Sequence, residues 1–247
     1  MNNLMKAEWY RLRHSGNTMI FILLIGVVAV LLQFMGNDGP DATAKSFYIH
    51  SSLGMAIAVG GVTSVILSTF NNRLADYEIM KGTPPMTMIL GKTLMTLTIV
   101  TVIYFLPSVA AVLINDRANL TLSMILLTYV CVIKLTVIAV SLCIMCKDAV
   151  GSVAFVMLLA FESVPLVFLQ NVLGINTVPL TSYLTSTQLI IIGNIGVIDL
   201  DELSMELDTS HIGIKVIISF AVLAALMIAA AHKSLKDKWE IRLISPD

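Results

Sequence analysis

The stretch NTMIFILLIGVVAVLLQFM, residues 17–35, is an apolar run without a charged side chain. About 20 such residues, wound as an α-helix, cross the hydrocarbon core of a bilayer. The run is longer than the apolar core of a usual signal peptide, and it lacks an Ala-x-Ala exit. It therefore predicts a first membrane-spanning helix.

More apolar runs follow it in a chain that is 57% hydrophobic and only 13% charged, with a mean hydropathy of +0.90. Soluble domains carry about 25% charged residues. Such runs must be helical in lipid, because the alternation of barrel strands is absent. We expect an all-α, polytopic membrane protein forming one transmembrane domain over residues 1–247. Its six predicted spans lie near residues 17–35, 47–70, 93–114, 120–146, 149–172 and 211–232.

Lys and Arg are distributed unevenly between the two sets of alternating loops. Cytoplasmic loops carry an excess of these residues. One side holds Lys6, Arg11, Arg13, Arg73, Lys81, Lys92, Lys147, Lys233, Lys236, Lys238 and Arg242. The other side holds only Lys45, Arg117 and Lys215, together with many acidic residues. We therefore predict that both termini are cytoplasmic. The net charge of −1 argues against a nucleic-acid partner.

The N-terminal residues 1–15 form the first of three predicted non-spanning elements. Wound as a helix, they place Trp9 and other apolar residues in one arc, with Lys6 and Arg13 opposite. This layout is typical of a helix lying in the membrane interface. Glu8 falls inside the apolar arc, where it either reaches headgroup water or makes a specific contact.

The second element, residues 71–92, is the longest predicted cytoplasmic connection. Its first half has the pattern of a short polar helix, Gly82 supplies a left-handed stop, and Pro84-Pro85 forbids continuation. A solvated loop is the alternative. The third element, residues 173–210, is interrupted by glycines and flanked by acidic residues. We expect it to form short external helices that dip toward the bilayer.

No catalytic or metal-binding set emerges from the sequence. The four histidines are isolated, so there is no His-Glu-x-x-His, and Gly-x-Ser-x-Gly is missing. Gly91-Lys92-Thr93 resembles the end of a phosphate-binding loop, but Met86 stands where that loop needs its first glycine. We therefore expect no enzymatic activity and no nucleotide site in this chain.

Two ionisable residues, Lys134 and Glu162, lie well inside predicted spans. A charge at mid-membrane costs about 2.5–3.5 kcal/mol or more, so it should be paired or neutralised. At a rise of about 1.5 Å per residue, both lie roughly 20 Å from the predicted cytoplasmic end. They form either a structural ion pair that fixes helix register or a polar site for transport or proton coupling.

Two stretches resemble the type-2 ABC transporter permeases, in particular the small six-span permeases of peptide-antibiotic immunity and peptide-toxin exporters. Lys6-Ala7-Glu8-Trp9-Tyr10-Arg11-Leu12-Arg13 is similar to the family's amphipathic entry helix. Asp76-Tyr77-Glu78-Ile79-Met80-Lys81-Gly82-Thr83, followed by Gly91-Lys92, is similar to its cytoplasmic coupling segment.

The resemblance implies a partner ATP-binding subunit that carries ATP and Mg, and a second permease subunit, identical or related. The residues implied to couple to the ATPase are Asp76, Glu78, Gly82, Thr83 and Lys92. Residues 173–210 are like the re-entrant helices of related exporters. The implied location is the bacterial inner (cytoplasmic) membrane. Export of amphipathic or hydrophobic peptides is the leading hypothesis, and an ion- or proton-coupled carrier or channel using Lys134 and Glu162 is the alternative.

Overall fold

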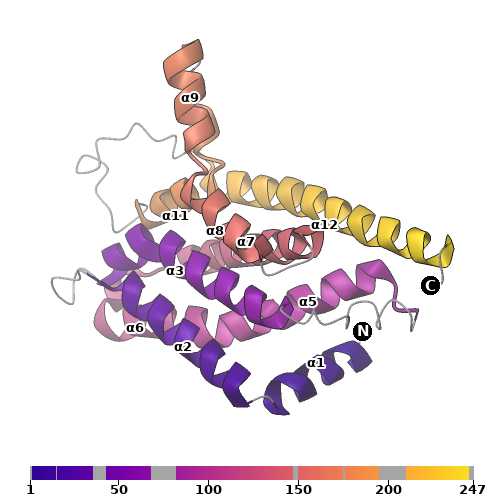
Figure 1. Ribbon diagram of the computed structural model, residues 1–247. Coiled ribbons are helices and arrows are strands. Elements are labelled where there is room, and N and C mark those ends of the chain that lie inside the picture. The colour runs from indigo at the N-terminus through magenta and orange to yellow at the C-terminus, as the bar shows by residue number, and fades with distance from the viewer. Residues whose placement is uncertain are drawn as a thin grey trace.

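The computed structural model describes residues 2–14, 16–35, 43–67, 82–146, 150–174, 176–194 and 210–244, and all regular structure in these ranges is helical (Figure 1). The longer elements are α1 (Asn2–His14), α2 (Gly16–Gln33), α3 (Thr43–Leu67), α5 (Pro85–Val100), α6 (Leu106–Asn115), α7 (Leu122–Cys146), α8 (Val150–Ala160), α9 (Val164–Leu173), α11 (Thr185–Asn194) and α12 (Ile212–Ile244). Three short elements are η3 (Thr101–Phe105), η4 (Arg117–Asn119) and α10 (Val178–Thr181).

Five of the described helical stretches are long and apolar enough to cross a membrane. Large apolar side chains such as Phe21, Leu24 and Leu226 point outward from them. A water-soluble surface would not expose so many, whereas lipid accommodates them. The predicted all-α, multi-pass membrane protein is confirmed at this level. The five stretches are Gly16–Gln33, Thr43–Leu67, Pro85–Asn115, Leu122–Cys146 and Ile212–Lys236.

The third of these stretches begins earlier than its predicted span and is not a uniform α-helix. It starts at Pro85, and a π-helical segment, η3, joins α5 to α6. The Leu106 N–H bonds to the Thr101 carbonyl, which is the wider π spacing. Pro107 follows directly and cannot donate a backbone hydrogen bond, so the irregularity lies beside a residue that disrupts regular α-helical bonding.

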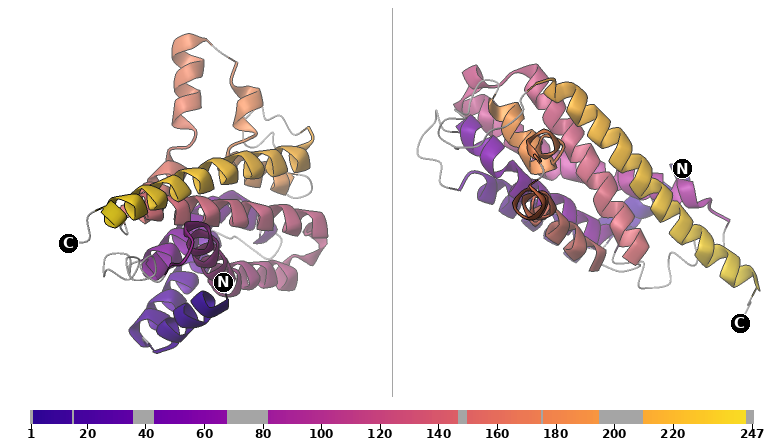
Figure 2. Two further views of the ribbon diagram at one scale, coloured as in Figure 1. Left: turned by 90° about the vertical axis from the view of Figure 1, so that its right-hand side faces the viewer. Right: turned by 90° about the horizontal axis from the view of Figure 1, so that it is seen from above.

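The stretch predicted as one span over 149–172 is divided. α8 ends at Ala160, α9 begins at Val164, and the two helices are bent by 44°. α9 stands out from the side of the bundle, and the chain returns through α10 to α11 (Figure 2). α8 and α11 each pack against α3 and α7. If the bent pair α8–α9 counts as one span, the number of candidate spans rises to six.

Buried polar contacts join the helices at the end of the bundle where α2 ends. The Gln33 side chain donates to the Phe47 carbonyl at 3.0 Å and accepts from Ser108 Oγ at 3.0 Å. Asp116 accepts from the Ala44 N–H at 3.1 Å, which supplies a partner at the start of α3. These contacts hold α2, α3 and α6 together.

Close helix approach sets a stability test at Gly26. A Cβ there would lie 2.8 Å from the Ile103 carbonyl oxygen, so Gly26→Ala forces α2 away from η3. We expect a loss of about 1–3 kcal/mol, measured by unfolding in detergent. Gly16→Ala is the control, because nothing lies within 4 Å of its Cβ, and it should change stability by less than about 1 kcal/mol. Equal stability of the two variants would contradict this packing.

Candidate functional site

α11 lies inside the bundle, more deeply than the external dipping helix that the sequence predicted. It packs against α3, α7 and α12, and Leu189, Ile191 and Ile192 are fully buried. The chain leaves α8, passes through α9 and α10, which project from the bundle, and re-enters the bundle at Thr185. The rest of the predicted external segment, residues 195–209, lies outside the described part of the chain.

Lys134 on α7 is fully buried and binds neutral partners. Its Nζ donates to Gln188 Oε1 of α11 at 2.7 Å and to Ser219 Oγ of α12 at 3.3 Å. Gln188 Nε2 also donates to Ser219 Oγ at 3.0 Å. Hydrogen bonds to a charged group are worth about 1.5–3 kcal/mol, so this cluster links three helices firmly.

Glu162 lies in the turn between α8 and α9 and is half-buried. Its Oε1 accepts from the Ser186 N–H at 3.0 Å and from Ser186 Oγ at 3.2 Å. Ser186 is in the first turn of α11, where backbone N–H groups have no partner within the helix. The carboxylate therefore caps α11 and compensates the positive end of its dipole.

The two charges thus act on the same helix from different sides. Among the described residues, no direct ion pair joins Lys134 to Glu162. In place of the structural ion pair, which was one of the two predicted alternatives, α11 has two separate attachments: Lys134 reaches Gln188, and Glu162 reaches Ser186. Gln188, Ser186 and Ser219 could not be recognised from the sequence, because neutral polar residues are common in membrane helices.

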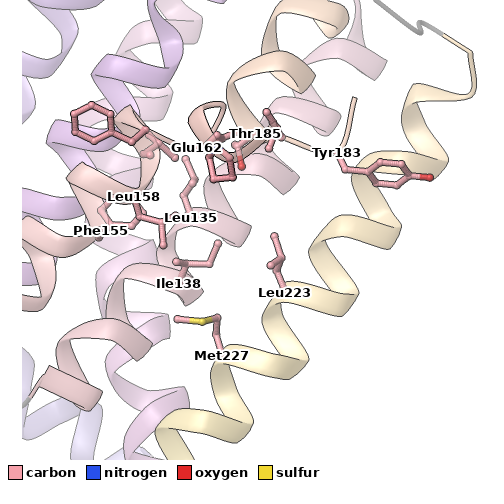
Figure 3. Close-up of a pocket in the computed structure, with 13 residues that line it drawn as sticks. Leu135, Ile138, Phe155, Leu158, Glu162, Tyr183, Thr185, Leu223 and Met227 are labelled. Carbon is pink, nitrogen blue, oxygen red and sulfur yellow. The ribbon is translucent and has the colours of Figure 1, made fainter. Parts of the chain in front are cut away.

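A cavity of about 370 Å³ opens where α8 ends and α11 begins (Figure 3). We call this interruption between α8 and α11 the break. In Figure 3, Leu223 and Met227 of α12 project toward Leu135 and Ile138 of α7, with Glu162 near the start of α11. Glu162 is the one charged side chain in an otherwise mostly apolar lining of described residues. The other lining residues are Phe155, Leu158, Leu159, Phe161, Pro165, Tyr183, Leu184 and Thr185. This surface suits an apolar or amphipathic guest.

Residues of the predicted coupling segment are only partly described. Asp76 and Glu78 lie outside the described residues. Gly82 has the predicted left-handed conformation, with φ of +77°, and Thr83 separates it from the proline pair that starts α5. Lys92 is only 2% exposed, within α5 rather than at the predicted entry of a span.

Residues 2–14 of the predicted interfacial segment form the helix α1, which packs beside α2 and α5. Trp9 is 51% exposed and Arg13 is also exposed, whereas Leu12 is buried. Glu8 and Arg11 belong to the same helix, but their side chains lie outside the described part of the chain.

Comparisons of the sequence and the fold find no matching family model, curated protein or solved structure.

The Lys134 cluster yields a double-mutant test. Gln188→Leu removes the 2.7 Å acceptor and should cost about 2–3 kcal/mol, because a buried ammonium loses its best partner. Lys134→Met combined with Gln188→Leu replaces both partners by apolar groups and should recover much of this loss. Unfolding of the single and double variants in detergent measures the coupling energy. Strictly additive effects would show that the two residues do not interact.

Proposed function

We propose that this chain is the membrane-spanning permease subunit of an ATP-driven ABC exporter that moves amphipathic or hydrophobic peptides, such as antimicrobial or toxin peptides, out of the cell or the membrane. The observation that carries the proposal is the apolar cavity at the break between α8 and α11. Transport sites in membrane proteins are commonly formed where helices are discontinuous. An apolar cavity with one carboxylate suits a guest with a mainly apolar surface.

In this proposal α8 and α11 together form one membrane crossing, which precedes α12 and brings the number of crossings to six. Each is too short to span a bilayer alone, since 11 and 10 residues rise only about 15 Å, but together they reach about 30 Å. Both pack against α3 and α7, and in Figure 2 α8 lies toward the end of the bundle where α12 ends, with α11 toward the opposite end. Six crossings return both termini to the cytoplasmic side of a bacterial inner membrane.

The arrangement of the chain ends supports this topology. α1, the start of α5 and the C-terminal part of α12 lie at the same end of the bundle (Figure 1). Most Lys and Arg residues are assigned to that side by sequence. A positive bias of this kind marks the cytoplasmic side.

ATP and Mg are bound by a partner subunit, which docks on residues 71–92 through Asp76, Glu78 and Thr83. The left-handed Gly82 lies three residues before the proline that starts α5, so the part of this segment that precedes α5 is joined to the helix by a short connection. α5 packs against α3, α7 and α12, so a displacement of its start reaches the walls of the cavity. Because Lys92 is buried, its role is to fix α5 in the bundle rather than to touch the partner. A second permease subunit, identical or related, completes the transporter.

An ion- or proton-coupled carrier or channel is the second candidate, because Lys134 and Glu162 are ionisable groups beside the break. It requires gradient-driven transport by the chain alone. The exporter requires ATP and a partner. Vesicles with and without ATP, in the absence of an ion gradient, distinguish the two.

The proposed docking of the ATP-binding subunit on residues 71–92 is tested by Asp76→Ala combined with Glu78→Ala. The double variant should lose most of the ATPase that co-purifies with the chain, because the acidic contacts of the docking segment are gone. Asp199→Ala combined with Glu202→Ala removes the same charge from the predicted external segment and should leave co-purification unchanged. If the variant with both Asp76→Ala and Glu78→Ala kept normal ATPase association and normal transport, the assignment of residues 71–92 as the coupling segment would be wrong.

The proposed role of the cavity as the peptide-binding site is tested by a substitution that fills it. Leu223→Trp should lower ATP-driven uptake of a fluorescent amphipathic helical peptide into inverted vesicles by about tenfold or more, with ATPase association unchanged, since the indole occupies the space where the guest binds. Leu226→Trp is the matched control, because Leu226 is 61% exposed on the same helix and does not line the cavity. Equal uptake by both variants would place the path elsewhere.

A further inference from the structure

A second hollow, of about 460 Å³, lies between α1 and α5. α1 contributes Lys6, Trp9, Tyr10 and Arg13 to its wall, spaced so that they share one face of the helix. Lys6 and Arg13 therefore lie on the same side as Trp9, and the prediction that they lie opposite it is wrong. Met95 and Thr98 of α5 form the opposite wall. The rim is therefore cationic and aromatic, and the floor is largely apolar.

Two smaller hollows continue from it and share its Trp9. One, of about 200 Å³, is bounded by Trp9, Leu12, Arg13 and Met19. The other, of about 160 Å³, also shares Thr98 and runs between α2 and the α5–η3 stretch, where apolar side chains such as Ile22, Val102 and Ile103 line it. A positively charged entrance thus leads into an apolar groove.

The charge of this entrance is not cancelled by a described neighbour. Lys6 and Arg13 are both exposed, and no acidic side chain lines the three hollows among the described residues. Trp9 and Tyr10 are the residue types that favour the level of lipid headgroups.

We propose that this site binds one anionic phospholipid of the cytoplasmic leaflet, with its phosphate between Lys6 and Arg13 and an acyl chain along the groove between α2 and η3. Basic residues near the membrane surface attract anionic lipid headgroups. An acidic surface of a partner protein would use the two cations but would leave the apolar groove without a role. The inference does not depend on the transport proposal.

The full chain, purified in detergent, is tested by native mass spectrometry with dioleoyl phosphatidylglycerol and with dioleoyl phosphatidylcholine. The wild-type chain should retain the anionic lipid preferentially. At about 1 kcal/mol per basic residue, Lys6→Ala and Arg13→Ala should each weaken its binding about fivefold. Lys6→Arg combined with Arg13→Lys keeps the charges and should preserve binding. Lys233→Ala is the matched control, because Lys233 is exposed in the C-terminal half of α12 and does not line these hollows.

The groove is tested separately by Val102→Trp, which fills the apolar part without changing charge. It should also weaken retention of the anionic lipid, and the chain's melting temperature without added lipid checks that each variant is folded. Equal retention of the two lipids, or an equal loss in Lys233→Ala, would overturn the proposal in favour of general surface attraction. Normal lipid retention in a folded Val102→Trp variant, with binding lost only when the cations are removed, would overturn it in favour of attraction of the lipid headgroup alone.

Discussion

A helix that stops inside a membrane must find partners for the backbone groups at its broken end, because lipid offers none. In the proposed topology, the start of α11 satisfies this constraint through Glu162, which accepts from both the Ser186 N–H and its hydroxyl. On the other side of the break, the turn between α8 and α9 keeps local backbone bonds, such as Phe161 N–H to the Met157 carbonyl at 3.0 Å. The irregular backbone is thereby tolerated where it borders a cavity.

The second attachment of α11 explains why a buried lysine is retained in α7. An isolated charge at this depth is unfavourable, yet Lys134 binds Gln188 and Ser219 and so ties α7, α11 and α12 together. The cavity lies between these same helices and α8. Any movement that changes the position of α11 therefore changes the shape of the cavity, which links the polar contacts to the proposed transport step.

The sequence predicted the apolar helices well and the interior of the site poorly. Long uncharged runs determine helices in lipid almost by themselves, so four of the five spans were found within about four residues at each end, whereas the third begins at Pro85, well before its predicted start at residue 93. The left-handed Gly82 was also predicted, because glycine and the following prolines act locally. The turn at residues 161–163, where α8 ends, was not predicted. The apolar run continues through it, and hydropathy does not distinguish a straight helix from a bent one.

The partners of the two charges were missed for a different reason. Gln188 lies 54 residues from Lys134, and Ser219 lies 85 residues away, so only the folded bundle brings them together. Equal depth suggested a direct contact of Lys134 with Glu162, but depth along the membrane normal does not fix the direction in which a side chain points. Asp76 and Glu78 remain predictions of the family resemblance, as they lie outside the described residues.

The claim that α8 and α11 meet at a break inside the membrane is tested most directly by cross-linking in native membranes. In a chain whose three cysteines are replaced by alanine, Glu162→Cys and Ser186→Cys are treated with a short bifunctional thiol reagent, and the linked peptides are identified by mass. The account predicts an efficient link within one chain. Absence of that link, with position 186 instead labelled by a membrane-impermeant maleimide, would place α11 on the outer surface and contradict the account.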